Sequence, residues 1–117
     1  MNEEEMKKRT KEFAKEIIRL CRIIPEKREG RLIANQLFRA GTSIAANYRA
    51  VCRARSTADF ISKLGIVEEE ADETLFWLEL LKEMKITDHS SVNALMKEGN
   101  EIISMIVSSI KTCKAKK

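Results

Sequence analysis

Apolar residues recur along most of the chain at intervals of three, four and seven positions, which places them on one face of an α-helix. Pro25 ends the first such segment, because a helix cannot easily continue through proline, and a hydroxyl of the Ser56-Thr57 pair can cap the third. The four predicted helices run from about Met6 to Ile24, from about Gly30 to Ala54, from about Thr57 to Met84, and from about Val92 to Ile110.

Four long helices joined by short loops predict an all-α protein, an antiparallel up-down four-helix bundle. Four glycines and one proline are too few turn residues for a β-sandwich or barrel. The 117 residues are expected to form a single domain, 1–117, whose lysine-rich end, 113–117, is frayed. The longest uncharged run, 102–110, is about half a membrane span, and the acidic start is unlike a signal peptide. The expected location is the cytoplasm.

Residues that carry catalytic chemistry are scarce. Cys21, Cys52 and Cys113 are odd in number and form no C-x-x-C pair, so we expect small apolar residues in a reducing compartment, with no disulfide or zinc site. His89 is the only histidine, and no Ser or Cys pattern accompanies it to form a triad. The sequence therefore predicts no enzyme activity, no metal and no cofactor.

One enzymatic alternative rests on acidic residues. Glu69, Glu70 and Glu73 satisfy E-E-x-x-E, the start of the magnesium site of all-helical nucleotide pyrophosphohydrolases that resemble the MazG family. The partner motif should follow on the next helix, where Glu98 and Glu101 are the available acids. Helical spacing turns both away from the apolar face, which argues against a shared metal site.

Charge is distributed unevenly along the chain, whose net charge is +4. Segment 27–57 holds seven basic residues and one acid, whereas segment 58–85 holds eight acids and three lysines. At about 100° per residue, five arginines of the second helix fall within about 80° of one another, opposite its apolar side. This arginine stripe consists of Arg28, Arg31, Arg39, Arg49 and Arg53.

The arginine stripe predicts nucleic-acid binding, to RNA or DNA, with structured RNA favoured. Arginine suits the bidentate recognition of phosphate, and a row of arginines can follow a nucleic-acid backbone. Arg39 and Arg49 are the strongest single candidates, because both lie near the middle of the helix. The alternative is a solvated outer face whose arginines pair with acids of a neighbouring helix, such as Glu69, Glu70 or Glu73.

The third helix carries a second apolar set in addition to its main apolar face. A helix of a bundle needs only one such face, so the second set predicts an interface with another copy of the chain. The alternative is that this set lies beneath the first helix. Its members are Ile66, Phe76, Trp77, Leu80 and Met84.

Three stretches resemble a known family. The run Phe38–Arg49, which reads FRAGTSIAANYR, resembles the signature of bacterial four-helix-bundle proteins encoded in intervening sequences of 23S rRNA genes. Downstream, 55–60 matches the family's Arg and Ser followed by an acid before Phe, and Glu70–Leu81 is similar to its E-A-x-E-T-x-[YF]-W-L-x-L-L variant. Together with Pro25, the resemblance covers about Phe13 to Met84.

The resemblance implies a bundle that can assemble into a five-membered ring and has no established enzymatic activity. Some members carry a ribosomal-protein label. Similar accessory proteins of diversity-generating retroelements are basic pentamers that bind nucleic acid and a reverse transcriptase, so a reverse transcriptase is an expected partner if the chain is linked to a retroelement. At 47–51 the chain reads Asn-Tyr-Arg-Ala-Val, where many members read Asn-Ile-Ala-Glu-Gly. The family's glutamate is absent from this chain, so any role of that residue in the family is not expected here.

Taken with the family resemblance, the sequence predicts a bacterial, cytoplasmic, non-enzymatic homo-oligomer, with a pentamer favoured, that binds RNA through the arginine stripe. The alternative from a different class is a protein–protein adaptor or assembly scaffold that binds no nucleic acid. The RNA-binding protein and the adaptor would use the same surfaces. In the adaptor, the charges of the second helix would serve protein contacts only.

Overall fold

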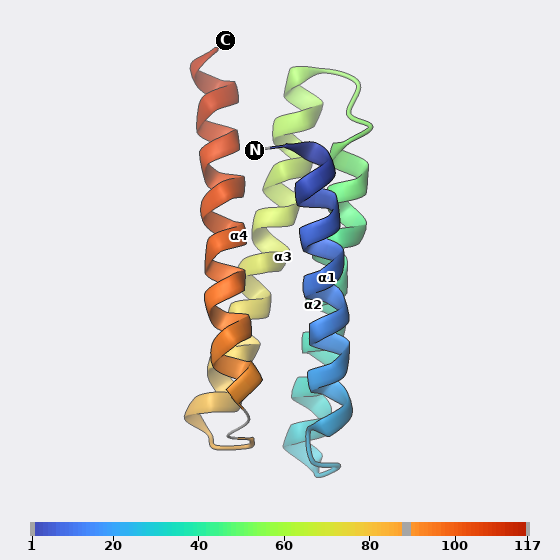
Figure 1. The fold of residues 1–117 in the computed structure, drawn as a ribbon, viewed down its shortest axis with the longest axis vertical. Coiled ribbons are helices and arrows are strands. Elements are labelled where there is room, and N and C mark those ends of the chain that lie inside the picture. Colours follow the sequence, from blue (N-terminus) through green and yellow to red (C-terminus); the bar gives the residue numbers. More distant parts are fainter. Residues whose placement is uncertain (1, 88–89, 117) are drawn as a thin grey trace.

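The computed structural model describes residues 2–87 and 90–116. It contains four α-helices: α1 (Glu3–Ile23), α2 (Arg28–Val51), α3 (Thr57–Glu83) and α4 (Ser90–Ala115) (Figure 1). In Figure 1 the chain runs down α1, up α2, down α3 and up α4, so consecutive helices are antiparallel. The predicted four-helix bundle is confirmed, and the described residues include no strand.

The helix ends follow the local chemistry of the sequence. The Asn2 side chain caps α1 by accepting hydrogen bonds from two backbone amides of the first turn, at 2.8 and 3.2 Å. The Ser56 hydroxyl caps α3 by accepting a hydrogen bond from the Asp59 amide at 3.0 Å, as predicted. The first helix ends at Ile23, two residues before Pro25.

The last helix is longer than predicted. It continues to Ala115, past the predicted end at about Ile110, so residues 113–115 are helical in the structure. Lys114 lies in the last turn, where a positive charge interacts favourably with the carbonyl end of the helix. His89, which the sequence analysis placed in the preceding turn, lies outside the described residues, as does Lys117.

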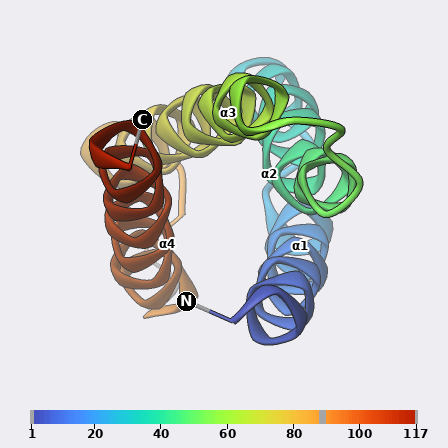
Figure 2. The same cartoon turned by 90° about the horizontal axis from the view of Figure 1, so that it is seen from above.

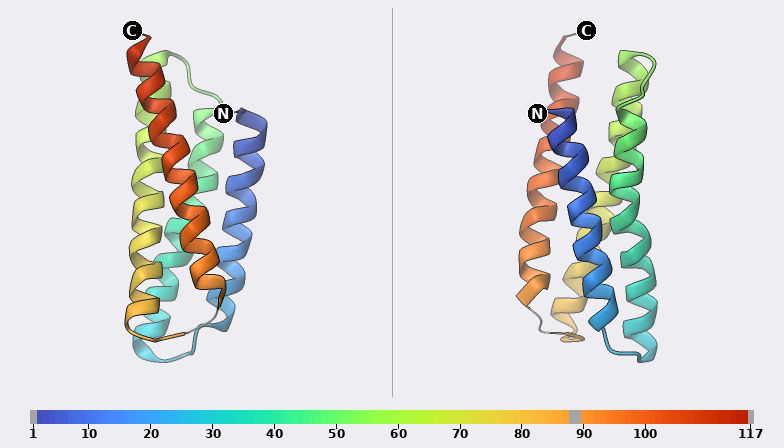
Figure 3. Two further views of the ribbon diagram at one scale, coloured as in Figure 1. Left: turned by 60° about the vertical axis from the view of Figure 1, so that its left-hand side comes forward. Right: turned by 45° about the vertical axis from the view of Figure 1, so that its right-hand side comes forward.

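The four helices are arranged around a square, and each contacts two neighbours (Figure 2). α1 contacts α2 and α4, and α3 also contacts α2 and α4, so α1 and α3 lie on a diagonal. The side views in Figure 3 show α4 tilted relative to α3. The body measures 48 × 21 × 20 Å, and no helix in the described part of the chain has the length and apolarity that crossing a membrane requires.

A charged group joins α1 to α4. Nε of Arg9 donates to one carboxylate oxygen of Glu98 at 2.6 Å, and its Nη2 donates to a carboxylate oxygen of Glu101 at 2.7 Å. The hydrogen bond with Glu98 is the largest of the contacts that raise the pKa of Arg9. Glu98 and Glu101 therefore hold the first helix against the last, a role that the sequence alone did not reveal.

Gly41 is a position at which α2 packs closely against α1. A Cβ atom at Gly41 would lie 2.8 Å from both γ carbons of Ile17, which is fully buried. By contrast, a Cβ atom at Gly65 in α3 would have no other described atom within 4 Å, apart from its own helix backbone and chain neighbours. The two glycines therefore differ in the space available for a side chain.

This difference predicts opposite effects of the same substitution. Gly41→Ala is expected to lower the free energy of unfolding by about 1–3 kcal/mol, because the added methyl group overpacks the contact with Ile17. Gly65→Ala is expected to raise it by about 0.5–1 kcal/mol, because alanine has the higher helix propensity. Urea unfolding of both variants provides the measurement, and a stabilising Gly41→Ala would contradict the tight contact.

Replacing Tyr48 by phenylalanine is expected to stabilise the folded protein. Its side chain is fully buried, and its hydroxyl has no hydrogen-bond partner among the described residues. Burial raises the pKa of Tyr48 to about 12. An unsatisfied buried hydroxyl costs about 1–3 kcal/mol, so Tyr48→Phe, which keeps the ring, is expected to raise the free energy of unfolding by about 1 kcal/mol. A loss of stability in urea unfolding would show that the hydroxyl has a partner in solution.

Candidate nucleic-acid interface

All five members of the arginine stripe are exposed, four on the outer face of α2 and Arg53 in the turn that follows, because α2 ends at Val51 rather than near the predicted Ala54. The opposite face of the helix carries Leu37, Ile44, Tyr48 and Val51, which are buried in the core. Because this core face holds α2 against the bundle, the stripe points away from it. The arginines are therefore accessible to a ligand in the monomer.

Arg39 differs from the other members of the stripe because it is bound to two acids of α3. Its guanidinium donates to Glu70 at 3.3 Å and to Glu73. Glu73 also accepts a hydrogen bond from the indole nitrogen of Trp77 at 3.0 Å, and this bond, followed by the one from Arg39, lowers the pKa of Glu73. Arg39 thus has the pairing that the alternative interpretation of the stripe predicts, and it connects α2 to α3.

The other four arginines make no ion pair within the residues that the structure describes. They form two groups, one at the start of α2 and one around its end. A rise of about 1.5 Å per residue separates Arg31 from Arg49 by about 27 Å along the helix axis. These four unpaired arginines are Arg28, Arg31, Arg49 and Arg53.

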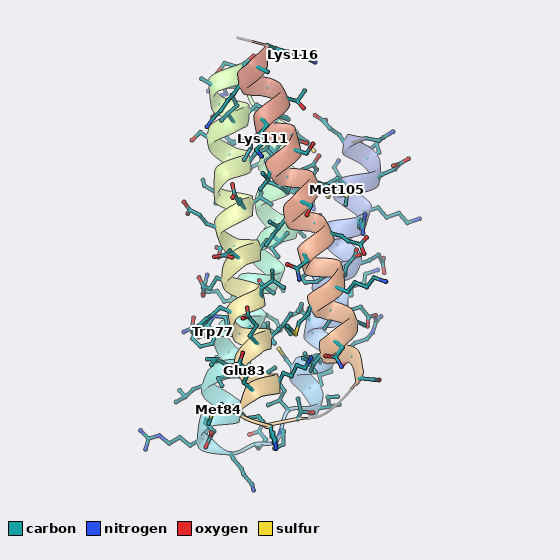
Figure 4. The ribbon with its side chains drawn as sticks, turned by 90° about the vertical axis from the view of Figure 1, so that its left-hand side faces the viewer. Trp77, Glu83, Met84, Met105, Lys111 and Lys116 are labelled. Carbon is teal, nitrogen blue, oxygen red and sulfur yellow. The ribbon has the colours of Figure 1, made fainter. Side chains whose placement is uncertain are left out.

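The second apolar set of the third helix, called the α3 patch from here on, lies on the outside of the bundle. The exposed fractions of Ile66, Phe76 and Met84 are 44%, 51% and 60%, and Trp77 and Leu80 are partly buried. Figure 4 shows Trp77 and Met84 on the side of α3 that faces away from α4. The alternative that the first helix covers this patch is wrong, because Ile66, Phe76 and Met84 stay exposed and α1 lies on the diagonal from α3.

The aromatic residues of the α3 patch are held in a fixed arrangement. The rings of Phe76 and Trp77 pack edge to face, with their centroids 5.0 Å apart and their planes at 71°. Since the Trp77 indole is bound to Glu73, which also binds Arg39, the apolar patch and the arginine stripe are joined by one hydrogen-bonded chain of side chains.

Sequence reasoning missed two exposed apolar side chains that flank the arginine stripe. Leu32 is 57% exposed and Phe38 is 45% exposed. On a helical projection Leu32 falls on the side of the stripe towards α3, and Phe38 falls on the side towards α1. Their positions outside the apolar face of α2 could have revealed them, but the sequence argument for this helix considered only its charged residues. The outer face of α2 is therefore mixed, with arginines beside apolar groups.

The acids of the enzymatic alternative are not brought together. Glu70 and Glu73 bind Arg39 on the outer side of α3, while Glu98 and Glu101 bind Arg9 between α1 and α4. Within residues 2–87 and 90–116, no three acidic, histidine or cysteine side chains form a group that could hold a metal ion. The described residues therefore do not form the magnesium site of the enzymatic alternative.

The three cysteines are free and partly buried. Burial raises the pKa of Cys21 to about 11, and burial is also the largest cause of the raised pKa of Cys52. The Cys21 thiol donates to the carbonyl oxygen of Ala34 at 3.5 Å. Both thiols are thus protonated at neutral pH, the opposite of what a nucleophilic cysteine requires.

The protein is a helical bundle that exposes a row of arginines, and its acidic candidate residues are bound in structural ion pairs. These features define a class of helical protein whose candidate functional parts are surfaces. The family model for the 23S rRNA-intervening sequence protein matches residues 2–108. The chain belongs to this family. Neither this match nor the structural comparison that follows points to an enzyme family.

The chain is also similar to a solved structure, a protein with unknown function from the S23 ribosomal protein family of Bacteroides thetaiotaomicron VPI-5482. The two are 35% identical, the match covers 95% of this chain and 99% of the other, and the TM-score is 0.86. Comparison with the curated proteins gives no match. The resemblance stated from the sequence motifs is thus confirmed over nearly the whole chain.

Proposed function

We propose that this protein is a non-enzymatic, cytoplasmic RNA-binding protein that contacts RNA phosphates through the four unpaired arginines of α2. The observation that carries the proposal is that these arginines are exposed on one face and have no carboxylate partner among the described residues. A guanidinium without a partner keeps its donors available for a phosphate. The three free cysteines fit a reducing compartment.

Arg39 has a different part in this proposal. Its donors are engaged by Glu70 and Glu73, so it neutralises acids that would otherwise repel a nucleic-acid backbone. The exposed Leu32 and Phe38 beside the stripe add apolar surface against which an unpaired base can pack. This composition favours single-stranded or looped RNA over a regular duplex.

We also propose that the protein forms a homo-oligomer through the α3 patch, and that a five-membered ring is its most plausible form on family grounds. Exposed aromatic and aliphatic side chains of this kind are typical of interface cores. A ring would repeat the four unpaired arginines around its circumference. Several weak phosphate contacts would then act together, and avidity can exceed a single contact by orders of magnitude.

The second candidate function is an adaptor or assembly scaffold that binds no nucleic acid. The observation in its favour is the ion pairing of Arg39 with Glu70 and Glu73 of α3, which engages one arginine of the stripe with protein carboxylates instead of leaving it for a phosphate. If the chain is encoded beside a reverse transcriptase, that enzyme is the partner to be tested.

Fluorescence anisotropy with a labelled, structured RNA at about 50 mM salt, followed by a salt titration, distinguishes the two functions. RNA binding predicts measurable affinity that falls steeply with salt, because each neutralised phosphate releases counterions. An absence of binding at low salt leaves the adaptor as the function.

A further inference from the structure

An open cavity lies where α2 ends and α3 begins. Its volume is about 520 Å³, and basic side chains dominate its lining. Two arginines come from the turn between the helices, and a lysine and a carboxylate come from the first turns of α3. The lining residues are Ala50, Arg53, Arg55, Asp59 and Lys63.

Asp59 organises one wall of this cavity. One of its carboxylate oxygens accepts a hydrogen bond from Lys63 Nζ at 2.5 Å, and the other accepts one from the Arg55 backbone amide at 3.0 Å. The contact with Lys63, followed by that with Arg55, lowers the pKa of Asp59, which keeps the carboxylate charged. Lys63 and the backbone of Arg55 are therefore held in place, and the guanidinium of Arg55 is left to face a ligand.

The cationic side chains that line the cavity outnumber its carboxylates. Three cationic side chains and one carboxylate leave two positive charges in excess. Arg53 and Arg55 make no side-chain ion pair with any described residue. The cavity of about 500 Å³ beside α4 differs in this respect, because its Arg9 is already bound by Glu98 and Glu101.

We propose that this cavity binds a phosphate monoester, and that Arg53, Arg55 and Lys63 donate to its oxygens. A terminal phosphate carries a charge of about −1.5 to −2, which matches the excess charge of the cavity better than the single charge of a backbone diester. Ala50, which has only a methyl group, leaves room between the two helices. The ligand is the phosphorylated end of an RNA strand or a free nucleotide, and the first of these rests on the proposed RNA binding.

The test compares one RNA oligonucleotide with a 5′-phosphate and with a 5′-hydroxyl. At about 50 mM salt, the wild-type protein is expected to bind the phosphorylated form about tenfold more tightly or better, because each hydrogen bond is charge-assisted. Arg55→Gln combined with Lys63→Gln is expected to abolish this preference. The control, Lys11→Gln with Lys111→Gln, removes the same charge from α1 and α4 and is expected to retain it.

A second measurement separates the two sources of phosphate and keeps this proposal independent of RNA binding. Inorganic phosphate and a nucleoside 5′-monophosphate are titrated while the backbone amide resonances of residues 50–63 are followed by NMR. Shifts confined to this segment, lost in the Arg55→Gln and Lys63→Gln variant, support the site even if no RNA binds. Shifts with the nucleotide alone assign the site to free nucleotides.

The outcome that overturns the site leaves the proposed function standing. If the two RNAs bind equally and phosphate perturbs no resonance of residues 50–63, the cavity is not a phosphate site and RNA binding through α2 remains. If neither RNA binds but phosphate shifts those resonances, the proposed function fails and the site remains.

Discussion

Replacing the four unpaired arginines of α2 by glutamine is expected to weaken RNA binding by about a hundredfold. An exposed ion pair contributes up to about 1 kcal/mol, so four phosphate contacts together supply about 3 kcal/mol. The dependence of log affinity on log salt is expected to become shallower by about 3, because four fewer phosphates release counterions. Anisotropy titrations at several salt concentrations measure both effects. The substitutions are Arg28→Gln, Arg31→Gln, Arg49→Gln and Arg53→Gln.

Two controls make this result specific. The first removes the same charge at exposed positions of α1 and α4, and its affinity is expected to stay near that of the wild type; it combines Lys8→Gln, Lys11→Gln, Arg22→Gln and Lys111→Gln. The second is Arg39→Gln, which is expected to change RNA affinity little, because Glu70 and Glu73 already occupy the Arg39 donors. Charge reversal at Arg39 is a poorer test, since a glutamate there would face both acids.

Wild-type affinity in the fourfold glutamine variant would exclude the arginine stripe as the RNA site. A variant that loses its oligomeric state but keeps its helicity would instead identify the stripe as a protein interface, and the adaptor would become the preferred function. Circular dichroism and a mass measurement in solution therefore accompany the binding experiment.

Charging the α3 patch is expected to convert the proposed oligomer into a folded monomer. Phe76 and Met84 are exposed in the single chain, so Phe76→Glu with Met84→Lys is expected to leave the bundle intact. In an assembled interface the same changes bury charges and remove apolar contact area. Truncating an interface hot spot costs about 2 kcal/mol or more, so the two changes are expected to weaken association by about a hundredfold or more.

Light scattering at tens of micromolar protein measures this effect. The control is Ile23→Lys, which alters a similarly exposed apolar residue on α1, the helix diagonally opposite α3. Its mass is expected to equal that of the wild type. A wild-type protein that is monomeric under these conditions would contradict the proposed assembly, and a doubly charged variant that stays assembled would move the interface away from the α3 patch.

The helices and their faces were predictable because both depend on local spacing. A period of about 3.6 residues fixes which side chains share a face, whatever the helix packs against. The arginine stripe and three members of the α3 patch, Ile66, Phe76 and Met84, therefore appear in the sequence at positions that the structure exposes. The prediction of a capped α3 start at Ser56 was correct for the same reason, since a cap involves only the next few residues.

The partner of each face depended on the tertiary structure. Periodicity could not show that Arg39 meets Glu70 and Glu73, because this requires the antiparallel alignment of α2 with α3. Nor could it show that Glu98 and Glu101 bind Arg9, which is about ninety residues away along the chain. The order of the helices around the square placed α1 on the diagonal from α3 and so left the α3 patch uncovered.

By itself, then, the sequence determined four helices, their order and the residues that each presents outward. The tertiary structure decided which outward charges are free and which are paired, and it formed the basic cavity between the end of α2 and the start of α3. The physical reason is the range of the interactions. Hydrogen bonding and side-chain spacing within a helix involve neighbours along the chain, whereas ion pairs and cavities arise between residues that only packing of the apolar faces brings together.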